Sequence, residues 1–327
     1  MAASVYTDFR ILDEHLHRGV QEEMSQRVNA FNEETFGCIR LIDERVSGHF
    51  EHNVLWKDLP NAIAWRDIAS TAAVADSKID EIDEIAVKIN RRIVPHAATG
   101  DALRKSLAGF NNDLEQWSAN WGQRLARNIP KDMLNTALLA ATAAIRNQAS
   151  NLEDQGGTGT ITSSMLPDAL YRMGDAAERV KCWIMHSKVF KDLLKEQITT
   201  NRLEVTAFAL FEGAPATLNK PVFITDSPNL IVAGTPNEYL TLGLVEDGIV
   251  LKNAEEEDML VRKVDGLHQI LYRIQGEFAY TIQVKGFQWD TTNGGINPQD
   301  AAVGTGTNWD IVASSNKSLA GVVLQTQ

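Results

Sequence analysis

The sequence predicts an α+β fold, because three features divide it between helix and sheet. Apolar residues recur at helical spacing along residues 110–148. A glycine-rich run at residues 156–160 then interrupts the regular pattern. Beyond Thr200, short apolar runs separated by turn residues are typical of β-strands. Long helix and clustered strands in separate parts of one chain indicate an α+β arrangement.

The N-terminal segment predicts an amphipathic helix. From Phe9 to Phe31, apolar residues return every three or four positions and charges fill the positions between them. Gly19 weakens the helix at one point. Such a helix either packs on its own domain or lies as an arm on a neighbouring subunit.

Residues 37–56 predict a polar β-hairpin. Ile39 and Leu41 alternate with a polar residue, Ser47 and Gly48 supply a turn, and a second apolar run follows. The many charges leave little apolar surface to bury, so we expect this hairpin to project from the body. Residues 86–93 predict a strand ending near Pro95, with a helix as the competing interpretation.

The segment 110–148 predicts the longest helix. Pro130, two residues after Asn128, is expected to kink or restart it. The following run, 153–160, reads as a flexible connection and as the best internal domain boundary.

A helix–strand–helix unit is predicted next. A short helix at 166–173 is expected to end at Gly174 in a left-handed conformation. Residues 180–185 then form a buried strand, and Ser187 caps a helix over 188–197.

The remaining chain predicts mainly strands. Short strands are expected at 203–211, 221–225, 230–233, 239–245 and 248–252. An acidic run at 255–258 reads as a solvated loop. Long strands are expected at 268–280 and 281–289, with Gly276 and Gly286 as bulges or bends, and a last strand at 317–324.

Composition narrows the function classes. The chain has 327 residues and a net charge of −12, which argues against a broad basic surface for nucleic acid. Its two cysteines, Cys38 and Cys182, form no disulfide framework and suit a reducing compartment. The first ten residues lack a secretory pattern, and the longest apolar stretch, 137–145, is too short to span a bilayer. We therefore expect a cytoplasmic chain without membrane contact.

No motif predicts catalysis, a cofactor or a metal. The run 156–160 lacks the Gly-Lys-Ser/Thr ending of a phosphate loop. His49 and His52 have no fixed third ligand for a metal. His186 adjoins Ser187, but neighbouring residues cannot readily form a nucleophile–base hydrogen bond. We therefore predict a protein that is not an enzyme.

Three segments, 31–41, 173–194 and 284–309, resemble the major capsid (coat) proteins of tailed bacteriophages. The resemblance implies the fold of that family: an N-terminal arm, an extended β-hairpin loop, a peripheral domain with a long spine helix, and an axial α/β domain. The implied boundaries are 1–36 for the arm, 37–75 for the extended loop, 76–152 for the peripheral domain, 153–256 for the axial domain, and 257–327 for the return to the peripheral domain and the closing strands.

The same resemblance implies a structural function. Copies of the chain would assemble as hexamers and pentamers into an icosahedral shell that encloses double-stranded DNA. Partners would be other copies of itself, together with scaffold, portal and decoration proteins. Assembly would take place in the host bacterial cytoplasm, and the product would be the virion capsid.

Contacts between subunits are expected in the arm and the extended loop, where residues 43–59 would reach over an adjacent subunit. The residues expected at these contacts are Phe31, Asp43, Glu44, Arg45, His49, Phe50, Trp56 and Lys57.

Two alternatives stay open at this point. A host nanocompartment shell would share the fold and enclose an enzyme instead of DNA. A soluble enzyme or ligand-binding protein would be a small oligomer with a saturable site in the axial α/β unit.

Overall fold

The computed structural model describes most of the chain. The described residues are 32–42, 44, 48–56, 63, 65–66, 68–74, 76, 81–99, 101–102, 105, 120, 122–125, 127–156, 159–199, 217–264 and 270–327.

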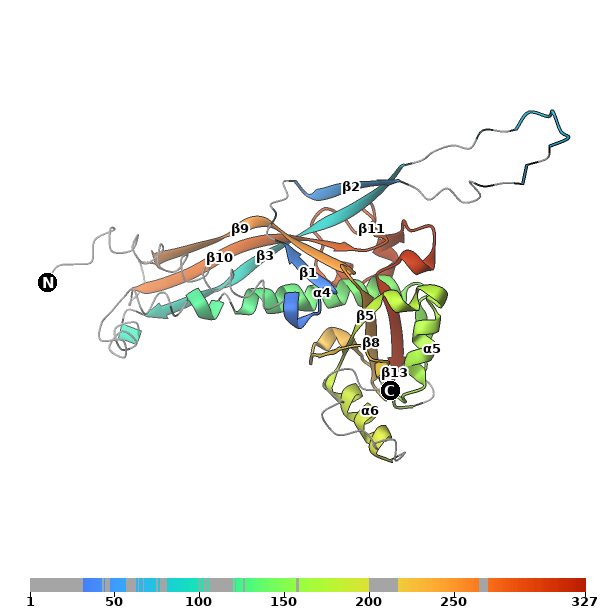
Figure 1. Cartoon of the computed structure of the whole chain (residues 1–327). Coiled ribbons are helices and arrows are strands. Elements are labelled where there is room, and N and C mark those ends of the chain that lie inside the picture. The colour runs from blue at the N-terminus through green and yellow to red at the C-terminus, as the bar shows by residue number, and fades with distance from the viewer. Residues whose placement is uncertain are drawn as a thin grey trace.

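A long five-stranded sheet forms the upper part of the molecule (Figure 1). Its strands lie in the order β1-β9-β10-β3-β2. Their bounds are Ile39–Ile42 for β1, Phe50–Trp56 for β2, Glu81–Thr99 for β3, Ile249–Val264 for β9 and Leu271–Val284 for β10. Strands β3, β9 and β10 exceed the usual 3–10 residues, so they extend as a ribbon beyond the main core.

Helix α4, Asn128–Arg146, runs beneath this sheet (Figure 1). Its alanine-rich second half lets the backbone approach closely, because Ala137, Ala140, Ala141 and Ala144 are fully buried. These residues join the main core with strands β1, β3, β9 and β10. The helix and the sheet therefore share one apolar layer.

A second sheet lies below α4 and carries the helices α5 and α6 (Figure 1). Its order is β4-β13-β8-β5-β6, and β7 also pairs with β8. The strands are β4 (Leu152–Asp154), β5 (Val180–Met185), β6 (Val222–Ile224), β7 (Ile231–Val232), β8 (Glu238–Val245) and β13 (Gly321–Thr326). The helices are α5 (Met165–Tyr171), the 3-10 helix η1 (Gly174–Arg179) and α6 (Ser187–Thr199).

The segment between β10 and β13 closes the molecule with short elements. These are β11 (Phe287–Trp289), α7 (Asp300–Val303), η5 (Gly306–Asn308), β12 (Trp309–Ile311) and η6 (Asn316–Ser318); the 3-10 turn η4 (Pro228–Leu230) lies earlier, before β7. Trp289 and Trp309 pack edge to face with ring centroids 5.0 Å apart, and both are buried. This aromatic pair joins β11 to β12 beside α4.

The predicted hairpin at 37–56 is wrong. Strand β1 pairs in parallel with β9, whereas β2 pairs antiparallel with β3, so the two strands lie at opposite edges of the sheet. The alternation predicted each strand but carried no information on its partner. Ile39 and Leu41 are buried in the main core, which favours pairing with the distant Ile249 and Leu251 over a polar local hairpin.

The predicted acidic loop at 255–258 is also wrong, because these residues lie inside β9. Glu255 pairs with Ala279 and Asp258 with Glu277. The run 255–258 contains only acidic residues, so it has no apolar alternation that the sequence could reveal, although the next residue, Met259, is buried in the main core. The register is irregular on either side of Ala279. The predicted break at 153–160 likewise contains β4, which pairs with β13.

Other predictions are confirmed. Residues 86–93 form a strand, although it continues past Pro95 to Thr99. Gly174 has the expected left-handed φ of 57°. The register between β3 and β10 shifts at Gly276, where a Cβ would collide with the backbone of Asp258. Helix α4 begins at Asn128, so the restart before Pro130 is confirmed.

Several predictions concern residues outside the described part of the chain. They are the amphipathic helix over 9–31, most of the helix over 110–127, and the strand at 203–211. Among the described residues, no helix is long and apolar enough to cross a membrane.

Candidate functional site

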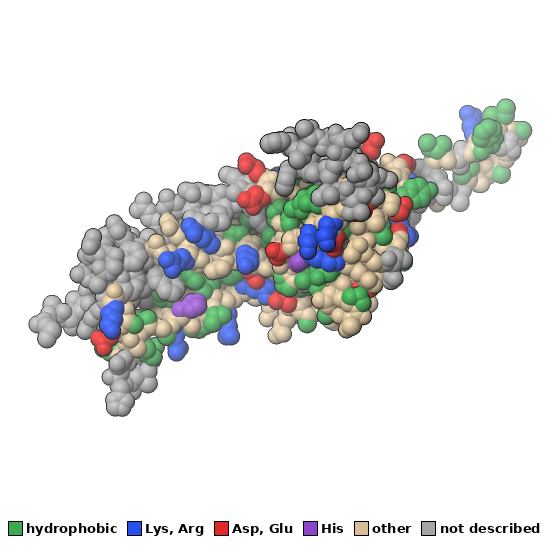
Figure 2. Space-filling model, turned by 90° about the horizontal axis from the view of Figure 1, so that it is seen from below, with side chains coloured by type: hydrophobic (Ala, Val, Ile, Leu, Met, Phe, Trp, Pro, Cys, Tyr) green, Lys and Arg blue, Asp and Glu red, His purple; other side chains and the backbone are tan. Residues whose placement is uncertain are grey.

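The described residues between β2 and β3 (63, 65–66, 68–74 and 76) lie away from the body (Figure 1), and we call this part of the chain the projecting loop. Four large apolar side chains in it are almost fully exposed: Ile63 (94%), Trp65 (98%), Ile68 (89%) and Val74 (90%). We call these four residues the apolar tip. Hydrophobic side chains are visible at the far end of the loop in Figure 2.

The exposure of these four side chains is informative because all four lie in the same loop. Single exposed apolar residues are ordinary on protein surfaces, but contiguous apolar patches mark interaction sites. Burying each Ile or Val side chain would yield about 1.5–3 kcal/mol. The apolar tip therefore gains stability only when another surface covers it.

The strands that carry the loop are held by a polar cluster on the sheet. Lys252 in β9 forms ion pairs with Glu51 at 2.6 Å and with Glu44 at 3.1 Å. Because β10 and β3 lie between β9 and β2, the contact from Lys252 to Glu51 reaches across the sheet. Burial disfavours the charge on Lys252, but the hydrogen bonds that its ammonium donates to Glu51 and Glu44 outweigh the burial and raise the pKa of this lysine.

The residues expected at subunit contacts fall into separate places. Glu44 binds Lys252, as described above, and so contributes to the fold of its own subunit. His49 is exposed, and its carbonyl accepts a hydrogen bond from the Lys88 N–H at 3.2 Å. Phe50 packs partly buried against the main core. Trp56 ends β2, where its backbone pairs with Glu81 at the start of β3. The others, Phe31, Asp43, Arg45 and Lys57, lie outside the described residues.

The sequence interpretation missed the apolar tip, although its expected extended loop at 37–75 covered all four residues. A signal was present. Ile63, Trp65, Ile68 and Val74 stand among Ala, Ser and Asp without the spacing of a helix or a strand. A tryptophan in such a segment has no neighbouring element to bury it.

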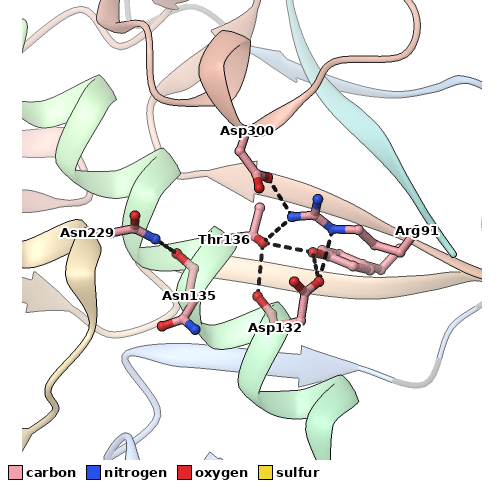
Figure 3. Close-up of polar contacts among 7 residues, drawn as sticks. Arg91, Asp132, Asn135, Thr136, Asn229 and Asp300 are labelled. Carbon is pink, nitrogen blue, oxygen red and sulfur yellow. Dashed lines mark hydrogen bonds and ion pairs between the residues drawn. The ribbon is translucent and has the colours of Figure 1, made fainter. Parts of the chain in front are cut away.

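A hydrogen-bond network connects the middle of β3 to α4 and α7 (Figure 3). Arg91 in β3 donates from Nε to Asp132 of α4 at 2.9 Å, and from Nη2 to Asp300 of α7 at 2.6 Å and to Thr136 at 2.8 Å. The hydroxyl of the buried Tyr280 in β10 donates to Asp132 at 3.1 Å. One guanidinium thus joins β3 to α4 and α7, and these charge-assisted bonds fix their relative positions.

The same helix is tied to the second sheet. Ser227 donates to the Asn135 side chain at 2.7 Å. Asn229 donates to the Asn135 carbonyl at 2.7 Å (Figure 3). Helix α4 therefore contacts the first sheet through Thr136 and the segment between β6 and β7 of the second sheet through Asn135.

The residues considered for catalysis have structural contacts. His186 Nδ1 accepts a hydrogen bond from the Lys188 N–H at 3.1 Å, so His186 caps α6 in the place predicted for Ser187. The hydroxyl of Ser187 instead bonds Asp226 and lowers the pKa of that carboxyl. Cys182 is buried against Cys38, and this contact together with burial raises its pKa far above the ordinary range. Among the described residues, no group of His, Cys, Asp and Glu could hold a metal.

Comparison with known proteins gives two findings. The family model described as "Gp13-like: Major capsid protein 13-like" matches residues 8–323. The structure is similar to a chain from Microbacterium phage Oxtober96, with a TM-score of 0.52 and 13% identity over 89% of this chain and 90% of that chain. It is also similar to a chain from the capsid of Myoviridae phage XM1, with a TM-score of 0.50 and 9% identity over 89% of this chain and 90% of that chain.

No curated protein matches the sequence. At these identities the structural similarity concerns the fold, and it confirms the mixed helix-and-sheet capsid fold expected from the sequence. The family match spans nearly the whole chain. The chain therefore belongs to the major capsid protein 13-like family of bacteriophage capsid proteins, and it is a structural component of the virion.

Proposed function

We propose that copies of this chain assemble as hexamers and pentamers into a closed icosahedral shell around double-stranded DNA. The observation that carries the proposal is the apolar tip, whose four large side chains are at least 89% exposed at the end of a loop that leaves the body. Such a surface requires a partner, and in a shell the partner is another copy.

The geometry of the loop supports this assembly. A loop that extends from one side of a subunit meets a different surface on its neighbour, which makes the contact heterologous. Repeated heterologous contacts close into rings when the rotation permits, as hexamers and pentamers require. Strand β2, which leads into the loop, is fixed by the ion pair between Glu51 and Lys252, so the loop starts from a defined direction.

The charge of the chain suits a container. With a net charge of −12, the subunit as a whole does not attract the phosphates of DNA. The genome is therefore enclosed without sequence-specific binding. Scaffold, portal and decoration proteins are the further partners that a shell of this kind implies, and assembly takes place in the bacterial cytoplasm.

The proposed division into domains differs from the expected boundaries, because β9 begins at Ile249 in the first sheet and β13 lies in the second sheet. The extended loop corresponds to the projecting loop and its strands β2 and β3, in place of residues 37–75. The first sheet with α4 serves as the peripheral domain, and the second sheet with α5 and α6 serves as the axial domain.

Removing the loop tests the proposal. Trp56 pairs directly with Glu81, so a two-residue Asn-Gly turn can join β2 to β3 in place of residues 57–80. We expect this variant to fold with unchanged circular dichroism and to form no closed shells in sedimentation. A control keeps the loop length and changes only the apolar tip to serine, and it should fail in the same way. Shells of normal size from the shortened variant would refute the function assigned to the loop.

A further inference from the structure

We propose that the apolar tip of one copy inserts into a pocket at the loop root of a neighbouring copy, with Trp65 as its anchor. This inference rests on the proposed shell function and adds to it the place where the loop binds.

The pocket has a volume of ≈ 400 Å³ and lies where the first sheet meets η1 and the segment after β12. We call it the root pocket. Its apolar wall includes Ile82, Val250 and Val312, and its charged groups include Glu84, Arg179 and Lys285. Pockets of about 300–1,000 Å³ hold drug-sized ligands, so the space suits an indole ring.

The tip of the same copy is far from its own root pocket. The projecting loop carries the described tip residues away from the body, whereas the pocket is part of the body, lined by Ile82 at the start of β3 (Figure 1). The occupant that the chain itself offers is therefore the tip of another copy.

The chemistry of the two surfaces matches. Trp65 is the largest of the four tip side chains and is 98% exposed, so it has the most apolar surface to bury. An indole in the apolar wall forms a type of contact that dominates protein interfaces, where Trp is among the commonest anchors.

The position of the pocket gives the contact a direction. Ile82 and Glu84 lie in β3, immediately after the projecting loop of the subunit that provides the pocket. Each copy therefore offers its tip to one neighbour and receives a tip from the other neighbour beside its own loop. The resulting interface is head to tail and can close a ring.

Disulfide trapping tests this inference. The native thiols of Cys38 and Cys182 are fully buried, so they leave the surface free for engineered cysteines. The double variant Arg66→Cys with Val312→Cys leaves Trp65 and the rest of the apolar tip intact, and it places one thiol beside the anchor and one in the pocket wall. A control combines Arg66→Cys with Tyr171→Cys, an 82% exposed position on α5.

Assembled particles of both variants are oxidised with copper phenanthroline and separated on a non-reducing gel. We expect a ladder of covalent oligomers from the Arg66/Val312 variant and single chains from the Arg66/Tyr171 control. Shells that form without the ladder, or with equal ladders in both variants, would overturn the docking site and leave the proposed function intact. The absence of shells from the wild-type chain would overturn both.

A pocket-filling variant gives an independent measurement. Val312→Trp narrows the root pocket from a half-buried wall position, so the subunit should fold as judged by circular dichroism and lose assembly at least tenfold in sedimentation yield. The same substitution at the exposed Ile311, outside the pocket lining, should assemble normally. Normal assembly of Val312→Trp would count against the docking site.

Discussion

Replacing Arg91 by methionine tests whether its guanidinium fixes β3 to α4 and α7. The substitution keeps an unbranched side chain of similar length and removes three hydrogen bonds, to Asp132, Thr136 and Asp300. The Arg91 side chain is only 21% exposed, so water replaces these bonds incompletely around it.

The expected loss in the free energy of unfolding is the sum of the contributions of the three hydrogen bonds. The Asp132 and Asp300 side chains are 41% and 61% exposed, so each ion pair is largely screened and contributes about 0–1 kcal/mol. The bond to Thr136 contributes about 1 kcal/mol because the threonine is buried. We therefore expect the free energy of unfolding to fall by about 2 kcal/mol, with the loss of bonds to Asp132 and Thr136 as the larger part.

The measurement is urea unfolding of unassembled subunits, followed by tryptophan fluorescence and circular dichroism together. The midpoint should fall while the dependence on urea stays unchanged. Asp300→Asn is the matched control, because it weakens only the most exposed of the three contacts and should cost less than about 1 kcal/mol. Equal midpoints for Arg91→Met and Asp300→Asn would refute the reasoning.

Three further predictions follow from single sites. Burial raises the pKa of Glu84, so the folded chain binds this proton more tightly than the unfolded chain. The stability that this proton contributes is lost as the pH rises from about 4.5 through the folded-state pKa. Glu84→Gln should therefore reduce the fall of the urea midpoint with pH over this range, and an unchanged pH dependence would contradict the assignment. Cys38 and Cys182 are fully buried, so neither should react with Ellman's reagent until urea is added, and a native reaction would show an accessible thiol. Gly321→Ala brings a Cβ against the Gly243 carbonyl between β13 and β8, and should cost about 3 kcal/mol in unfolding; wild-type stability would mean that the strands separate freely.

The strands of this fold are largely predictable from sequence, but their partners are not. Apolar runs at Ile39 and Leu41, at 180–185 and at 239–245 indicate strands because burial on a sheet requires them. Pairing of β1 with Ile249 depends on contacts more than two hundred residues apart, which no local pattern contains.

The candidate site shows the same limit. The expected extended loop covered the apolar tip, whereas the expected subunit contacts of Glu44 and Phe50, which contact Lys252 and the main core of their own subunit, stay predictions. Charged and aromatic residues look alike in sequence whether they bind a neighbour or their own core. Only the arrangement of β2 and β3 shows that Trp65 has no surface of its own subunit to cover it.

Electron microscopy of the purified chain, and of material from cells that produce it, tests the central claim most directly. The account predicts closed icosahedral shells, together with rings of six and five subunits. A monodisperse monomer or dimer that never assembles, even when its scaffold is present, would contradict it.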